Sequence, residues 1–302
     1  MIVRSRPRGW ELIGIWRLSI LSRIWPLLLV TAVFSSCVVL AAERFPAAFH
    51  TFNVAPFTLL GIALSIFLGF RNSACYDRWW EARRQLGALI GEMRSFARLL
   101  IETPGGDRVR RVRVVRRAIG YVYALMAHLR GRPMSREVAL YVPDWDSSRA
   151  TGNVPDALLR GIAAETGAMF AAGEFGEMFY LRLDERLSSF AAMQVACERI
   201  KGTPTPFPYT LLLHRTAYAF CFLLPFGLVG TLRYATPLFS AVVAYAFFGL
   251  DALGDELQEP FGEWLNALPL TAMARTVEIS LLETVGESKI PNALEPVRSV
   301  LQ

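Results

Sequence analysis

Residues 55–83 read APFTLLGIALSIFLGFRNSACYDRWWEAR. The start of this stretch belongs to a run of 17 uncharged residues, Val54 to Phe70, after which charged side chains recur at short intervals. At the helical rise these 17 residues extend ~26 Å, close to the ~30 Å hydrocarbon core of a bilayer. Proline does not recur between Pro56 and Pro104. The stretch therefore predicts a helix that crosses a membrane and continues into water.

Three further runs lack charged residues. The first, Ile24 to Ala42, has 19 residues, and Thr216 to Leu232 and Tyr234 to Leu250 have 17 each. Hydrophobic residues make up 53% of the chain, more than a soluble domain of this size needs. A signal peptide is the alternative for the first run, but no small-residue cleavage site follows it. We therefore expect four transmembrane helices.

Arginines near the ends of these runs predict the orientation. Five precede or begin the first run and five follow the second, whereas the connector between those runs has only Arg44 and the connector between the last two has only Arg233. Positive residues favour the cytoplasmic side. We expect the chain to lie in a bacterial inner membrane, with both termini in the cytoplasm. The ten arginines are Arg4, Arg6, Arg8, Arg17, Arg23, Arg71, Arg78, Arg83, Arg84 and Arg94.

The segments between these runs complete the expected organisation. We expect a cytosolic N-terminal segment at 1–23, membrane helices in 24–70, a helical cytosolic domain at 71–208, membrane helices in 209–250 and a cytosolic C-terminal segment at 251–302. Apolar residues at helical spacing predict a helix from Asp107 to Arg130. Met134 to Pro155 reads as a surface loop, and Gly173 and Gly176 suggest a break before a helix at Leu181.

The chain shows little sign of chemistry or of nucleic-acid binding. No metalloprotease, phosphate-loop or serine-nucleophile motif is present. The basic run GDRVRRVRVVRR has valines on one stripe, which is more typical of a solvated helix face than of a nucleic-acid arm. His214 and Arg215 are expected to anchor a helix end at the lipid headgroups. We expect neither an enzyme nor a nucleic-acid partner.

Bulky residues form one stripe of the second run. Ile62, Ile66 and Phe70 are four residues apart, and therefore share a helix face. One interpretation is that the stripe faces lipid while small residues face protein. The other is that it lines a pore, where a ring of apolar side chains would gate ions by dewetting.

The quoted stretch resembles the signature of the bestrophin family, through LGFRN and the Tyr76-x-Arg78 that follows it. Two other stretches also resemble that family: TPTPFPYTLLLHRT at 203–216 and DELQEPFG at 255–262. Their order and separation fit, so the resemblance covers almost the whole chain. It is similar to the short bacterial branch.

The resemblance implies an all-α homopentamer around a central ion pathway, with four transmembrane helices and a helical cytosolic domain in each subunit. Ile62, Ile66 and Phe70 match the family's hydrophobic neck. Met178, within GEFGEMFY at 173–180, matches a second constriction in the cytosol, with Phe179 as the alternative. Glu177 would place a ring of five carboxylates beside that opening, although it also reads as a solvated loop residue.

Calcium is not an expected ligand. Animal bestrophins bind Ca²⁺ through an acidic run after Pro-Phe-Gly, whereas here EWLNALPL supplies one carboxylate, too few for this ion. We expect Ca²⁺-independent gating and no metal or other cofactor. An acidic cluster is instead predicted to pair with arginines across a subunit interface. Its members are Asp251, Asp255, Glu256, Glu259 and Glu263.

The function implied is diffusion of small monovalent ions, with membrane lipid and other copies of the chain as partners. Glu177 and the bacterial branch favour cations. The alternative is a chloride or anion channel of the same architecture, because the cytosolic arginines would attract anions if they face the pathway. A membrane-anchored scaffold is the further alternative. A secondary transporter is disfavoured because the four runs lack ionisable residues near their centres.

Overall fold

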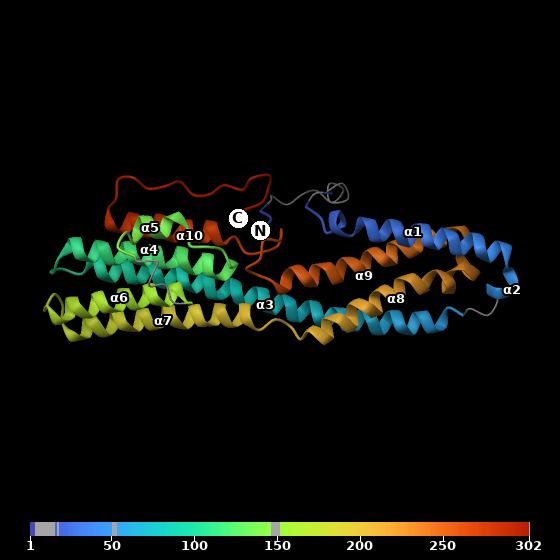
Figure 1. Ribbon diagram of the computed structural model, residues 1–302, viewed down its shortest axis with the longest axis horizontal. Coiled ribbons are helices and arrows are strands. Elements are labelled where there is room, and N and C mark those ends of the chain that lie inside the picture. Colours follow the sequence, from blue (N-terminus) through green and yellow to red (C-terminus); the bar gives the residue numbers. More distant parts are fainter. Residues whose placement is uncertain (4–15, 17, 50–52, 146–151, 302) are drawn as a thin grey trace. The chain divides into compact units, whose positions relative to one another are not determined.

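The computed structural model describes residues 1–302 except 4–15, 17, 50–52, 146–151 and 302. Within these described residues the regular structure is helical, and β pairing is limited to isolated bridges such as Ile2 with Val300 (Figure 1). The prediction of an all-helical chain is confirmed. Some residues used above fall outside the described ranges, namely Arg4, Arg6, Arg8 and Arg17.

The chain divides into two compact units. The apolar unit comprises Arg4–Trp79 and Pro204–Glu259, and the polar unit comprises Met1–Val3, Trp80–Thr203 and Pro260–Gln302. Helix α3 contributes residues to both. The helices are α1 Leu21–Arg44, α2 Pro46–Phe49, α3 Ala55–Glu102, α4 Arg108–Arg130, α5 Arg136–Tyr141, α6 Val154–Ala171, α7 Glu177–Gly202, α8 Phe207–Leu232, the 3-10 turn η2 Arg233–Ala235, α9 Thr236–Gln258 and α10 Leu270–Val285.

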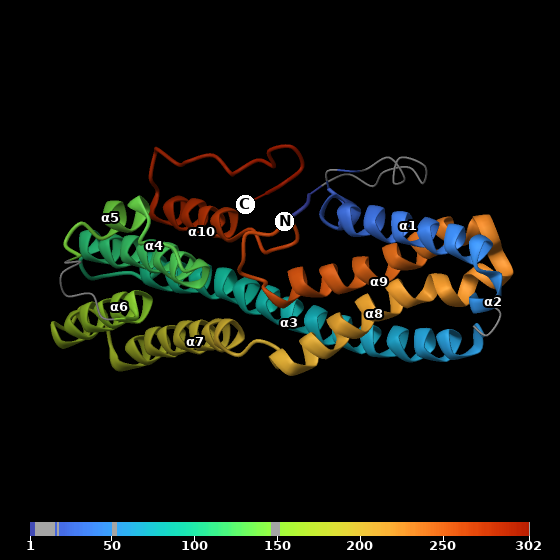
Figure 2. The same ribbon diagram turned by 45° about the vertical axis from the view of Figure 1, so that its right-hand side comes forward.

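The apolar unit contains the helices of membrane-spanning length. Among the described residues, three helical segments are long and apolar enough to cross a membrane: Leu21–Arg44, Ala55–Glu102 and Phe207–Gln258. The last consists of two helices, α8 and α9, because η2 separates them and Arg233 takes a positive φ of 47°. These two helices lie side by side, and α1 packs against both (Figures 1 and 2).

Leu64 and Leu68 pack the first half of α3 against the core of the apolar unit. They are four residues apart, so they lie on one face, and both are almost fully buried. They belong to an apolar cluster that includes Phe220 of α8 and Phe248 of α9. The rest of the circumference of α3 in this unit is mostly exposed.

Helix α4 is the centre of the polar unit and packs against α5, α6, α7 and α10. Its N-terminus is capped by the Asp107 carboxylate, which accepts hydrogen bonds from the backbone N–H groups of Val109 and Arg110. Its C-terminus ends at Gly131, which has a left-handed φ of 66° that glycine tolerates best. The predicted helix from Asp107 to Arg130 is confirmed.

The arginines of α4 pair with carboxylates of the same unit. Arg110 Nη1 lies 2.7 Å from Glu174 Oε1, and Arg117 Nε lies 3.0 Å from Glu165 Oε2. Arg116 also pairs with Glu287. Arginines of the run GDRVRRVRVVRR therefore form ion pairs within the polar unit.

Two sequence expectations for the polar unit are wrong. The presumed loop from Met134 to Pro155 contains α5, which the fully buried Val138 anchors. Six residues are too few for helical periodicity to show. Helix α7 begins at Glu177, not at Leu181, so Glu177 and Met178 occupy its first turn. A carboxylate in that turn is favoured by the helix dipole.

Candidate functional site

The stripe of Ile62, Ile66 and Phe70 faces away from the core of the apolar unit. These side chains are 55%, 51% and 65% exposed, whereas Leu64 and Leu68 on the opposite side are 2% and 0% exposed. Both interpretations of the stripe, lipid contact and pore lining, require exposure in a single chain. The apolar window of α3 is also less buried than the others, at 17%, against 28% for α1 and 44% for Phe207–Gln258.

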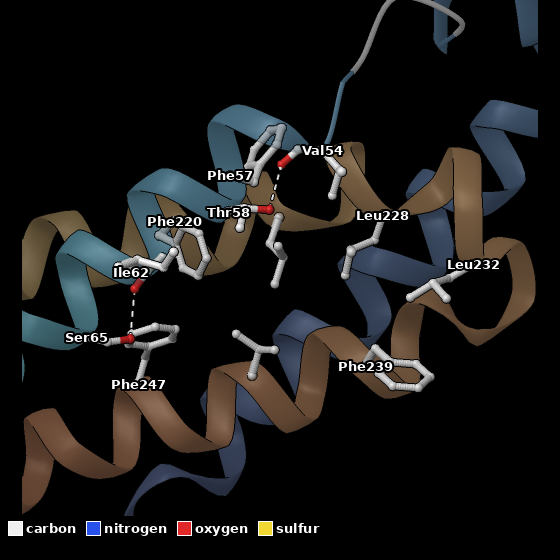
Figure 3. A pocket seen from close by; sticks show the side chains of 13 residues that line it. Val54, Phe57, Thr58, Ile62, Ser65, Phe220, Leu228, Leu232, Phe239 and Phe247 are labelled. Atoms are coloured by element: carbon white, nitrogen blue, oxygen red, sulfur yellow. Dashed lines mark hydrogen bonds between the residues drawn. The ribbon is translucent and has the colours of Figure 1, made fainter.

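Ile62 also borders an apolar cavity of about 330 Å³ between α3, α8 and α9. Figure 3 shows Ile62 beside Phe220, with Phe247 of α9 close to them. Two hydroxyls reach the cavity wall, but each is bonded within α3: Thr58 Oγ1 donates to the Val54 carbonyl at 3.2 Å and Ser65 Oγ to the Gly61 carbonyl at 2.8 Å (Figure 3). The lining therefore presents hydrocarbon.

The two candidates for the cytosolic constriction differ in their surroundings. Met178 is 72% exposed in the first turn of α7. Phe179 instead packs on Phe175, with ring centroids 4.8 Å apart, and lies 6.0 Å from the guanidinium of Arg111. Glu177 is exposed next to Met178. The turn before α7 depends on Gly173, which has a φ of 74°.

Directly after the stripe, Arg71 begins a group of ionisable side chains that we call the charged cluster. Arg71 Nη1 lies 2.7 Å from Asp251 Oδ1, and Arg71 Nη2 lies 2.5 Å from Asp255 Oδ1. The side chains of Arg71 and Asp251 are 1% and 5% exposed. The second Asp251 oxygen, Oδ2, lies 2.7 Å from Nδ1 of His214. The members of the cluster are Arg23, Arg71, His214, Asp251, Asp255 and Glu256.

Close helix packing makes these contacts possible. A Cβ atom added to Gly254 would lie 2.5 Å from Asn72 Oδ1 and 3.1 Å from Arg71 Nη1. Glycine at this position therefore admits the two polar residues of the Phe70-Arg71-Asn72 motif against α9. The motif joins the exposed stripe to a buried ion-pair network.

The predicted pairing of the acidic residues across a subunit interface is wrong for those with described partners. Asp251 and Asp255 pair with Arg71, and Glu256 pairs with Arg23, all within one chain. A signal was present in the sequence, because Arg71 continues the buried register of Leu64, Leu68 and Cys75 and should therefore point inward.

One further member of the acidic cluster has a partner in the polar unit, and the metal prediction can be compared with the described residues. Glu263 pairs with Arg132 in the polar unit. No group of three or more His, Cys, Asp and Glu side chains that could hold a metal occurs among the residues that the structure describes.

The fold and this site define an integral membrane protein of helical type. Residues 1–283 match the family described as Bacterial/Fungal Bestrophin protein, so the chain belongs to the bestrophin family. The resemblance seen in the sequence is confirmed. Members of this family are ion channels, which also confirms that the chain is not an enzyme.

Two curated relatives carry the same functional name. The voltage-dependent anion channel-forming protein mll4386 of Mesorhizobium japonicum is 43% identical over 95% of this chain and 93% of its own length. The voltage-dependent anion channel-forming protein YneE of Escherichia coli is 38% identical over 99% of this chain and 98% of its own. A crystal structure of a bacterial bestrophin homologue from Klebsiella pneumoniae has a TM-score of 0.82 at 35% identity, covering 87% of this chain and 98% of that one.

Proposed function

We propose that the chain is one subunit of a homopentameric channel that conducts small monovalent anions across the bacterial inner membrane. The observation that carries this proposal is the exposed stripe of Ile62, Ile66 and Phe70 on α3. A helix surrounded by copies of itself around an axis needs one face for the pore and two flanks for its neighbours. The low burial of α3 meets that need.

The preference for anions comes from the relatives. Both curated relatives reported above are named as anion channel-forming proteins. This favours the anion alternative over the cation preference that we predicted from Glu177. In this proposal the Glu177 carboxylates do not set the sign of the permeating ion.

Four membrane crossings fit the arrangement of the apolar unit. Helices α8 and α9 have 26 and 23 residues, and each is long enough to span a ~30 Å core. In this proposal they form four spans together with α1 and the first half of α3, and both termini lie in the cytoplasm. Lipid surrounds the spans, and no nucleic-acid partner is proposed because the arginines of α4 pair within their own unit.

Two constrictions control permeation in this proposal. The neck is the ring of Ile62, Ile66 and Phe70, which excludes ions by dewetting when narrow. The cytosolic aperture is a ring of Met178, favoured over Phe179 because the Phe179 ring is packed on Phe175. Gating is independent of Ca²⁺.

Alanine replacement in the neck tests the proposal. Ile66→Ala, measured in planar bilayers with the purified full chain, is expected to raise the current several-fold, because a smaller side chain leaves a wider and wetter ring. Leu60→Ala is a matched control, since Leu60 is an exposed apolar residue of α3 on a different helix face from the stripe. Equal currents for both variants and the native chain would contradict the neck, and the absence of any flux from proteoliposomes would favour the scaffold.

A further inference from the structure

We propose that His214 is a proton sensor that acts on the neck through Asp251 and Arg71. The inference rests on the proposed function, since it names a regulation of the same neck. It assigns a role to the charged cluster beyond holding helices together.

Short contacts link His214 to Arg71 through Asp251. His214 Nδ1 and Arg71 Nη1 each lie 2.7 Å from one oxygen of the same Asp251 carboxylate. Arg71 Nη1 also donates to the Asp251 backbone carbonyl at 3.2 Å, and Nη2 donates to Asp255 Oδ1 at 2.5 Å. A planar guanidinium that holds two carboxylates in this way is fixed in orientation. A change at Asp251 therefore reaches Arg71 directly.

Arg71 is the residue that follows Phe70 in α3. The last side chain of the neck and the buried arginine are thus on adjacent residues of one helix, about 100° apart around its axis, the first exposed and the second buried. Gly254 leaves no space between α9 and this part of α3, since a Cβ there would meet Asn72 and Arg71. Movement of the charged cluster is consequently transmitted to the end of the neck.

His214 is placed to exchange a proton with water. Its side chain is 44% exposed, while its Nδ1 contacts the buried carboxylate of Asp251. Histidine is the side chain that ordinarily changes charge between pH 5 and 8. The ring also packs on Tyr218, with centroids 4.3 Å apart, which holds its orientation.

The charges around His214 determine the direction of the effect. Arg71 comes from α3, Arg23 from α1, and Asp251, Asp255 and Glu256 from α9, while Arg215 and Tyr218 are on the same helix as His214. Within the charged cluster, protonated His214 gives three positive and three negative groups. Loss of that proton leaves two positive and three negative groups, and it turns the charge-assisted contact of His214 with the buried Asp251 into a weaker neutral one. Protonation therefore stabilises the arrangement that holds α3, and deprotonation loosens it.

The test uses the purified full chain in planar bilayers, with the pH of both compartments changed together. Open probability of the native channel is expected to rise roughly fivefold from pH 5.5 to 8.0, a coupling at the low end of the usual range between two sites. His214→Gln should show the high value at both pH values, and His214→Arg the low value at both. His128→Gln is the matched control, because His128 also lies near a carboxylate, 3.7 Å from Glu198, but belongs to the polar unit.

Hydrogen exchange gives a second readout that does not depend on current. Amides of α3 around Arg71 should be better protected at pH 5.5 than at pH 8.0, after correction for the intrinsic rate, and this difference should vanish in His214→Gln. A native chain with equal protection and open probability at both pH values overturns the sensor, as does a His214→Gln variant that keeps the native pH response. If Ile66→Ala changes the current while His214→Gln keeps that response, only the sensor fails. If neither the native chain nor any variant conducts, the channel proposal fails, and the sensor that rests on it fails with it.

Discussion

Two buried carboxylates, one in each unit, each contact an arginine but differ in their other partners. Asp251 in the apolar unit contacts Arg71 and the half-exposed His214. Glu278 in the polar unit accepts hydrogen bonds from the hydroxyls of Tyr123 at 2.6 Å and Tyr141 at 2.5 Å, with Arg275 Nε 3.1 Å away. The first set includes a group that ordinarily titrates near neutral pH, and the second does not. The proposed sensor depends on this difference, because the partners of Asp251 include a histidine and those of Glu278 do not.

The largest effect is expected at Arg71. Arg71→Met leaves Asp251 without its buried cation and should lower the free energy of unfolding by about 3–5 kcal/mol. Denaturant unfolding of the detergent-solubilised chain measures this. Arg132→Gln is the control, because Arg132 and its partner Glu263 are both exposed and that pair should contribute less than about 1 kcal/mol. Equal losses in both variants would show that the buried pair has no special role.

A smaller loss is expected at Glu278. Glu278→Gln keeps the shape but removes the charge that accepts from two hydroxyls, so the free energy of unfolding should fall by about 1–3 kcal/mol. The same unfolding experiment measures it. Because no partner here changes charge near neutrality, the loss should be equal at pH 6 and pH 8. A loss that changes between these pH values would break the contrast with Asp251.

The smallest expected effect is a loss of stability in alkaline solution that depends on Tyr123 and Tyr141. Burial, and then the hydrogen bond to Glu278, raise the pKa of both Tyr123 and Tyr141 above the ordinary value. Unfolded tyrosine loses its proton above about pH 10, while the folded residues keep theirs. Stability should therefore be intact below pH 10 and fall as the pH rises beyond it. Tyr141→Phe should reduce this slope, and an unchanged slope would contradict the assignment.

Much of the apolar unit was predictable because the position of charge along a chain is a local property. The uncharged run from Ile24 lies in α1, and the run from Val54 lies in α3 except for its first residue, since a long segment without charge has few alternatives to a buried or lipid-facing helix. The residues of the stripe were found by spacing alone. Their pore role rested on family resemblance and remains a proposal.

Long-range pairs were not predictable in the same way. Arg71 and Asp251 are 180 residues apart, and nothing local to either residue identifies the other. The register of Arg71 showed only that it should be buried. Similarly, α5 is held by tertiary contacts of Val138 and Tyr141, so its six residues carry no visible pattern.

The reversal potential under a KCl gradient tests the central claim most directly. The purified chain would be reconstituted in planar bilayers with tenfold different KCl on the two sides. An anion channel predicts a reversal potential close to the chloride equilibrium potential. A reversal potential close to the potassium equilibrium potential would contradict anion conduction and support the cation preference predicted from Glu177.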